Sequence, residues 1–336
     1  PPLRPLHLSV FAAGNLTPGE ATEQFRSALK VFGAREPARE PAREPAREPA
    51  GKAVGEPAGE DAGEDAACEP CEPSDAALAE HVTPPNAPAR SPVACVLLPA
   101  QPARHCYRVA STNASENNRA VEVYWQLGEE SADLAAKVDL LCHLMYEPLF
   151  NQLRTKETLG YSVDCSARCT HGVMGVVIAV TSATHTPAHI EGRVEAFLGR
   201  FLPSLGRMRR AAYTANVEAA VANKLRDDHN LGDEVQRALG EIEGRQYTWD
   251  RAEREAEAMR AVSQADLCAW ARRVLLGDGR RMLSIHSHEG SVDKPEAQPL
   301  PGGATAVVTP AAFKEPLKVH RRLDNPLPAL AIVAQA

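Results

Sequence analysis

The residues with the clearest chemical capacity lie in one stretch, F-N-Q-L-R-T-K-E-T-L-G-Y-S-V, at positions 150–163. It places Arg154, Lys156, Glu157 and Tyr161 between an apolar helical pattern and an apolar strand pattern. Arginine and tyrosine side chains can both donate hydrogen bonds. Alternatively, Arg154 could be a cation that complements a helix C-terminus, and Tyr161 a half-buried strand residue. Lys156 and Glu157 are interpreted as solvated or structural.

The histidines offer weaker candidates, because the sequence contains no G-x-S-x-G, Walker, G-x-G-x-x-G, H-E-x-x-H or H-x-x-E-H motif. His185 and His189 are four apart, but Pro187 lies between them and predicts that they straddle a helix start instead of sharing a metal face. His286 and His288 would point to one side of a strand, a geometry that two metal ligands could use. A solvated strand is the favoured interpretation of this pair.

Composition excludes some classes of protein. The 336 residues are 44% hydrophobic with a net charge of -7 and no concentrated basic face, so nucleic acid and anionic lipid are not expected partners. No run reaches the roughly 18 to 20 apolar residues of a membrane span, and the first residues do not form a signal peptide. We therefore expect a cytoplasmic location. Because the chain begins with Pro1, we expect it to be part of a longer protein.

The eight cysteines are too scattered to form the disulfide framework of a small secreted domain, so most are expected to be reduced. Cys68 and Cys71 form a C-x-x-C, but a structural zinc site needs a second pair of ligands. We therefore expect no metal at these two residues.

The N-terminal third divides into a short ordered segment and a linker. Thr17 and Glu20 form a capping box, which predicts a helix to about Val31. Arg-Glu-Pro-Ala then repeats four times, and proline at every fourth residue prevents a regular helix. With few apolar residues, the stretch 34–92 is predicted to be a disordered linker without an activity of its own.

After the linker, apolar periodicity predicts an α+β fold. The expected elements are strands at 92–99, 121–127 and 281–287, a hairpin at 160–169 and 173–183, a helix from Ala132, a helix from Pro187, and three helices between about 210 and 276. Pro148 should either kink the first of these helices or begin a second one. Ser263 is the expected N-cap of the last helix, and Gly277 its C-terminal residue with φ > 0. An antiparallel sheet with helices packed on one face follows from this order.

The stretch at 150–163 also resembles a known family. E-P-L-F-N-Q-L-R-T-K-E-T-L-G-Y is similar to a segment of the insulin-degrading enzyme and nardilysin group of the pitrilysin, or inverzincin, zinc metallopeptidases. V-E-V-Y-W-Q upstream, and P-A-H-I-E-G-R-V-E-A-F-L, G-R-Q-Y-T-W-D-R and F-K-E-P-L downstream, resemble the same family in the same order. The resemblance covers nearly everything except the Arg-Glu-Pro-Ala insertion and the extreme C-terminus.

The resemblance implies a division of the chain. Residues 1–33 would be the end of a preceding α+β domain, 93–317 the C-terminal peptidase-family domain, and 318–336 a tail. In this family, four related domains form two halves of a closed chamber, and the zinc motif H-x-x-E-H lies in the first domain. The chain would therefore be the half without the metal, and its partner would be an N-terminal catalytic half in the same polypeptide or a separate subunit.

The resemblance also assigns roles to Arg154 and Tyr161, which match an arginine and a tyrosine that reach the peptide substrate beside the scissile bond. Zinc would be the cofactor of the full-length enzyme, and this chain alone should bind peptide but cleave nothing. The alternative is a non-catalytic peptide-binding or partner subunit of the same family.

Overall fold

The computed structural model describes residues 95–101, 103–244 and 246–320, together with Thr17, Gly19, Glu20, Glu23, Gln24 and Ser27. The predicted linker at 34–92, with Cys68 and Cys71, lies outside the described residues, as does the chain after 320. Two compact units are distinguished, Pro1–Pro88 with Pro326–Ala336, and Ala89–Asn325. The domain boundaries inferred from the sequence remain predictions.

In the first unit, the predicted capping box is confirmed. The Thr17 amide donates to the Glu20 carboxylate at 2.8 Å, and the Glu20 amide donates to the Thr17 hydroxyl at 3.3 Å. These reciprocal bonds satisfy amides that a helix start leaves without partners. The expected helix end near Val31 lies outside the described residues.

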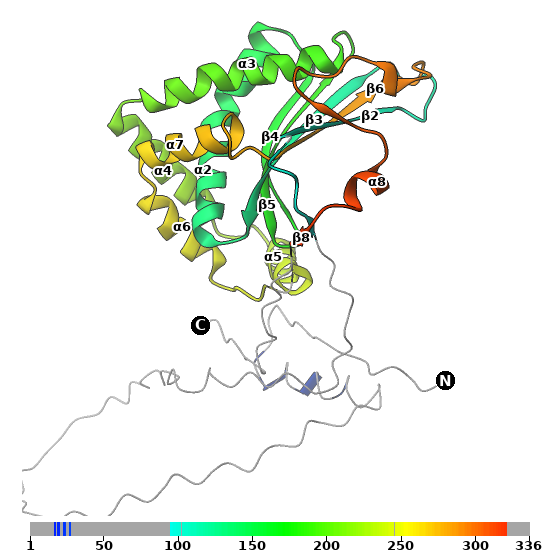
Figure 1. Cartoon of the computed structure of the whole chain (residues 1–336). Coiled ribbons are helices and arrows are strands. Elements are labelled where there is room, and N and C mark those ends of the chain that lie inside the picture. Colours follow the sequence, from blue (N-terminus) through cyan, green and yellow to red (C-terminus); the bar gives the residue numbers. More distant parts are fainter. Residues whose placement is uncertain are drawn as a thin grey trace, which may run out of the picture. The chain divides into compact units, whose positions relative to one another are not determined.

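The second unit is built on a six-stranded sheet, shown in Figure 1, with the strand order β4-β5-β3-β6-β2-β7. The strands are β2 (Arg104–Ala110), β3 (Arg119–Glu129), β4 (Ser162–Thr170), β5 (Val173–Ser182), β6 (Met282–His288) and β7 (Thr305–Val307). Neighbouring strands from β4 through β6 are antiparallel, as predicted, whereas β2 runs parallel to both β6 and β7. The sheet is therefore mixed within an α+β fold.

The sequence did not predict β2, because R-H-C-Y-R-V-A carries charged side chains and lacks a clear alternation. Of the strand expected at 92–99, the structure describes the residues from Cys95 onward. Within them β1 (Cys95–Val96) is the strand part, paired antiparallel with β8 (Val319–His320), so the predicted strand ends earlier than expected. Both errors fall where strands pair with segments far away in the sequence, and local apolar periodicity carries no information about such pairing.

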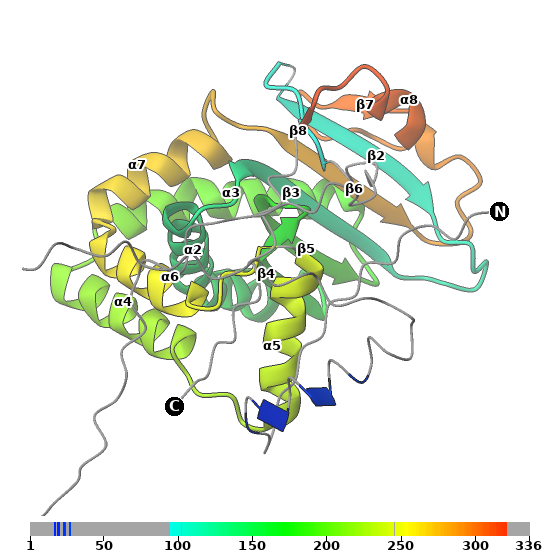
Figure 2. The same cartoon turned by 90° about the horizontal axis from the view of Figure 1, so that it is seen from below.

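Helices cover one face of this sheet (Figure 1). They are α2 (Ala132–Phe150), α3 (Pro187–Gly206), α4 (Arg210–Lys224), α6 (Arg251–Ala261) and α7 (Gln264–Leu275), while α5 (Leu231–Gly244) stands apart from this layer in Figure 2. The described residues between 210 and 276 thus hold four helices, not the three expected. The start of α7 after Ser263 was expected, so the helix that was not counted is one of α4, α5 and α6.

The ends of α7 test two predictions. Ser263 is its N-cap, as predicted, and accepts a hydrogen bond from the Asp266 amide at 3.1 Å. The expected φ > 0 at Gly277 is wrong, since this glycine is not among the described residues in the left-handed region. Glycine is favoured at position 277 for a steric reason instead, because a Cβ there would lie only 3.0 Å from the Arg273 carbonyl oxygen.

The predicted apolar faces form the core between the sheet and the helices. Val121, Val123 and Trp125 of β3 are buried, and the Trp125 indole donates to the Leu275 carbonyl oxygen of α7 at 3.2 Å. The predicted α3 face is also buried, comprising Ile190, Val194, Phe197, Phe201 and Leu205. The apolar faces predicted for α3 and β3 are therefore confirmed as the buried ones.

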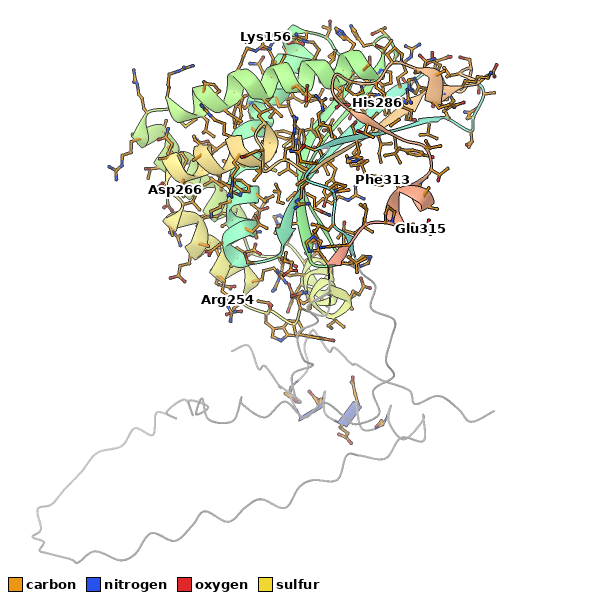
Figure 3. All side chains as sticks on the ribbon, viewed as in Figure 1. Lys156, Arg254, Asp266, His286, Phe313 and Glu315 are labelled. Carbon is orange, nitrogen blue, oxygen red and sulfur yellow. The ribbon has the colours of Figure 1, made fainter. Side chains whose placement is uncertain are left out.

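A small helix, α8 (Pro310–Lys314), packs on the other face of β2. Cys106 approaches Glu191 of α3 on the helix-covered face, so its neighbour His105 points the opposite way. There the His105 ring lies 4.9 Å from the Phe313 ring, which Figure 3 labels in α8. The helices are therefore concentrated on one face without being confined to it.

The six described cysteines are free thiols, namely Cys95, Cys106, Cys142, Cys165, Cys169 and Cys268. Among the described residues, every helix is too short or too polar to cross a lipid bilayer.

Candidate functional site

The stretch at 150–163 follows a change in helix type. After α2 the chain continues as a π-helix, η2 (Asn151–Lys156), in which the Glu157 amide reaches back five residues to the Gln152 carbonyl oxygen at 3.0 Å. Pro148 lies inside α2, three residues before the change, so it does not begin a second helix. Single π-turns within helices occur frequently at functional sites, which directs attention to this segment.

The helical segment ends at an unusual backbone conformation. Thr158 has φ of 48°, in the left-handed region that β-branched residues rarely adopt. The Leu159 amide donates to the Leu153 carbonyl oxygen at 2.9 Å, a bond that closes the helix end over this residue. The helical segment therefore ends at Thr158, before Tyr161.

Gly160 brings the segment against the sheet. A Cβ on this glycine would lie 2.2 Å from the Thr181 carbonyl oxygen, far inside any permitted contact. The same oxygen accepts a hydrogen bond from the Tyr161 amide at 3.0 Å. Only glycine can therefore occupy position 160 while the next residue starts its pairing with β5.

The two residues predicted from the sequence, Arg154 and Tyr161, both lie on the surface. Arg154 is exposed in η2, with its guanidinium 5.6 Å from the Phe150 ring centroid, and Tyr161 is 56% exposed just before β4. Within the described part of the chain, neither the guanidinium nor the phenol hydroxyl has a hydrogen-bond or ion-pair partner. The segment thus presents two free donors to an acceptor outside it.

Glu157 has a contact that sequence reasoning missed. Its carboxylate accepts two hydrogen bonds from Arg193 of α3, at 2.8 and 2.7 Å, and a third from the side-chain Nε2 of Gln152 at 2.6 Å. The Arg193 hydrogen bonds lower the pKa of Glu157 to about 2, although partial burial opposes the shift. No local pattern could reveal this pair, because the two residues are 36 positions apart. Lys156 is exposed, as expected (Figure 3).

The histidine pair at the start of α3 supports the same segment. Pro187 begins the helix, as predicted, and the rings of His185 and His189 stack at 5.3 Å between centroids. The His185 Nδ1 lies 3.0 Å from the Leu159 carbonyl oxygen, and the tautomer with hydrogen on Nδ1 donates to that oxygen. His185 therefore contacts the segment instead of forming a separate site.

The other histidine pair is buried, so its interpretation as part of a solvated strand is wrong. His286 and His288 do share one side of β6, but both are buried, and His286, labelled in Figure 3, contacts α3. The His286 Nε2 lies 2.6 Å from Glu191, and Arg104 donates to the other Glu191 oxygen at 3.0 Å.

Cys106 completes this buried cluster, in which one ligand-type atom from each of Cys106, Glu191 and His286 lies within 4.8 Å of the others. Burial raises the pKa of the Cys106 thiol to about 11. The His286 Nε2 and the nearer Glu191 oxygen are 2.6 Å apart, which is hydrogen-bond distance and too close for both atoms to bind one metal ion between them. The cluster instead ties α3 to β2 and β6 through a buried ion pair.

Comparisons with known proteins agree with this geometry. Residues 140–239, which include the whole segment, match the family model of the C-terminal lobe domain 4 of PqqF-like PQQ synthase. Over 184 residues, 54% of this chain and 16% of the relative, the sequence is 35% identical to nardilysin from Homo sapiens. Over 187 residues, 56% of this chain and 18% of the relative, it is 30% identical to insulin-degrading enzyme from Homo sapiens. The chain thus spans under a quarter of these relatives.

The fold has a counterpart among solved structures. The crystal structure of pitrilysin superposes with a TM-score of 0.64 at 16% identity, covering 92% of this chain and 27% of pitrilysin. With the family model and the two relatives, this makes the chain similar to the C-terminal portion of the insulinase, or pitrilysin, family of metallopeptidases.

Proposed function

We propose that this chain is the C-terminal, substrate-binding part of a zinc metalloendopeptidase that hydrolyses peptides in a closed chamber. The zinc site would lie on an N-terminal half. The observation that carries the proposal is the pair of free donors, Arg154 and Tyr161, at the surface of a segment fixed by a π-turn and a glycine. The similarity to nardilysin and insulin-degrading enzyme supports a peptide substrate.

The buried cluster of Cys106, Glu191 and His286 does not fit a catalytic zinc, because its residues are buried, whereas a catalytic zinc needs an open position for water. A zinc ion on the other half would supply activated water for attack on the peptide carbonyl. This chain would supply the donors. Arg154 and Tyr161 would hydrogen-bond the carbonyl region of the bound peptide, where negative charge develops during the attack. Donors placed in advance stabilise that charge without reorganising at the moment of reaction.

The proposal is tested by kinetics on the full-length protein, or on this chain combined with the catalytic half. Arg154→Ala and Tyr161→Phe should each lower kcat by roughly 10²- to 10³-fold, the effect typical of one lost donor, with little change in KM. Arg168→Ala is the control, because Arg168 is an exposed cation in β4 that pairs with Glu122 at 2.6 Å. Unchanged kinetics in both Arg154→Ala and Tyr161→Phe would reject the proposed roles.

A second experiment separates this proposal from a non-catalytic, peptide-binding subunit. The coding sequence upstream of Pro1 should contain H-x-x-E-H followed by a further glutamate ligand. An upstream half without that motif would favour the non-catalytic alternative. The purified chain alone should bind peptide and cleave nothing, so a chelator-sensitive peptidase activity from these 336 residues would contradict the division of labour.

A further inference from the structure

We infer that Glu157 is a positioning residue, which through its bond to Arg193 holds the segment 154–161 in the geometry that presents Arg154 and Tyr161 together. The inference deepens the proposed function and rests on it. Glu157 lies three residues after Arg154 and four before Tyr161, at the point where η2 ends. A restraint there acts on both donors.

The hydrogen bonds of the Glu157 carboxylate can hold the segment rigidly against α3. Both of its oxygens accept from Arg193, at 2.8 and 2.7 Å, in the two-bond geometry that fixes direction as well as distance. Gln152 adds a bond at 2.6 Å from within η2, and Arg200 lies 3.6 Å away. One carboxylate therefore joins two helices that are not neighbours along the chain.

The backbone next to Glu157 needs such a restraint. Thr158, in the left-handed region, is held in a conformation that is unfavourable for an L-residue. A strained residue persists only where its surroundings fix it from both sides. On one side is the Glu157 bond to α3. On the other are the buried Leu159 side chain and the Tyr161 amide bond to Thr181.

Losing the Glu157 restraint should let Thr158 relax. Since η2 and β4 are joined through this residue, relaxation changes the angle between the elements that carry Arg154 and Tyr161. Glu157 itself points at Arg193 and not at solvent, and 17% of its side chain is exposed. Its effect on a reaction would therefore be indirect, through the placement of the two donors.

The test measures kinetics in the full-length protein, or in this chain combined with the catalytic half. Glu157→Gln should lower kcat by about tenfold or more with KM changed less than about threefold, because misplaced donors weaken the transition state more than the bound substrate. The exchanged pair Glu157→Arg with Arg193→Glu should recover part of the loss. A role limited to overall folding would show no such recovery and would change the amount of active enzyme instead of the kcat per active site.

The matched control is Glu289→Gln. Glu289 also binds an arginine through two bonds, with Arg119 at 2.5 and 2.6 Å, and its exposure of 18% is close to the 17% of Glu157. The Glu289→Gln variant should lose about as much stability as Glu157→Gln but keep its kcat unchanged. In parallel, hydrogen exchange should accelerate at the Leu159 and Tyr161 amides in Glu157→Gln but not in Glu289→Gln.

The outcomes separate the inference from the proposed function. If Arg154→Ala and Tyr161→Phe lower kcat while Glu157→Gln behaves like Glu289→Gln, the positioning role is refuted and the proposed function stands. If Arg154→Ala and Tyr161→Phe have no effect, the proposed function fails, and the inference fails with it. If kcat falls in Glu157→Gln without faster exchange at Leu159 and Tyr161, the positioning mechanism is overturned.

Discussion

Replacing Glu191 by glutamine should destabilise the fold more than any comparable change to an exposed carboxylate on α3. The Glu191 side chain is 1% exposed and accepts from His286 at 2.6 Å and from Arg104 at 3.0 Å. Glutamine keeps the shape but removes the negative charge, so His286 loses its anionic acceptor and Arg104 keeps only the partly exposed Glu195 as an anionic partner among the described residues. Removing one partner of a buried pair typically costs about 3 to 5 kcal/mol, because the remaining charge stays buried.

This cost should be measured as the free energy of unfolding in urea, followed by tryptophan fluorescence. For a domain of this size, about 3 to 5 kcal/mol corresponds to a fall in Tm of roughly 6 to 20 °C. The control is Glu195→Gln, one helical turn away, which also binds Arg104, at 2.9 Å, but is 28% exposed. Partly exposed pairs contribute about 1 kcal/mol or less. An equal loss in Glu191→Gln and Glu195→Gln would refute the reasoning from burial.

The pH dependence gives a second check on the Glu191 pair. Burial raises the pKa of Glu191, but the hydrogen bonds from His286, Ser284 and Arg104 outweigh it, so the pKa lies below the usual value. A carboxyl whose folded-state pKa is lowered stabilises the fold above its unfolded pKa. The stability difference between the native chain and Glu191→Gln should therefore be largest near neutral pH and shrink as the pH falls below about 4.5. A difference that grows on acidification would contradict this sign.

Two further predictions concern the segment 154–161. Gly160→Ala should lower the free energy of unfolding by at least about 1 to 3 kcal/mol, because its Cβ would lie 2.2 Å from the Thr181 carbonyl oxygen. Gly192→Ala in α3, where a Cβ would have nothing within 4 Å, should raise it by about 0.5 to 1 kcal/mol. Urea unfolding of both variants tests this difference. Glu157, with its pKa lowered to about 2, should add at most about 3 kcal/mol to the free energy of unfolding relative to Glu157→Gln. This stabilisation should be fully present above pH 4.5 and be lost as the pH falls through 2. If acid unfolding shows a difference between the two chains that does not change with pH, the prediction is contradicted.

Much of the fold was accessible from the sequence, because its elements carry local signals. The α3 stripe, the alternation in β3 and the His171–Gly172 turn between β4 and β5, with φ of 51° and 76°, all follow from periodicity or turn chemistry. β2 was not accessible. Its residues lie in the sheet because β6 and β7 pair with it, and 172 or more positions separate it from those partners.

Part of the candidate site could likewise be predicted from the sequence, and part of it could not. Arg154 and Tyr161 could be identified because their sequence context resembles a family segment. The Glu157–Arg193 contact and the burial of His286 could not, since each depends on where α3 packs on the sheet. A charged residue in a sequence has no visible partner, so an anchored glutamate and a solvated one look alike until the helices are placed.

The structure also explains why so many polar side chains gather between α2 and β4. Free donors on a surface are useful to a reaction only if their backbone is stiff, because a donor that must reorganise stabilises little of the developing charge. Here the stiffness comes from residues with no exposed function: Glu157 bonded to α3, Leu159 in the core, and Gly160 against the Thr181 carbonyl. The polar residues of the segment therefore divide by direction, with the Glu157 carboxylate directed toward α3 and the Arg154 and Tyr161 donors directed to solvent.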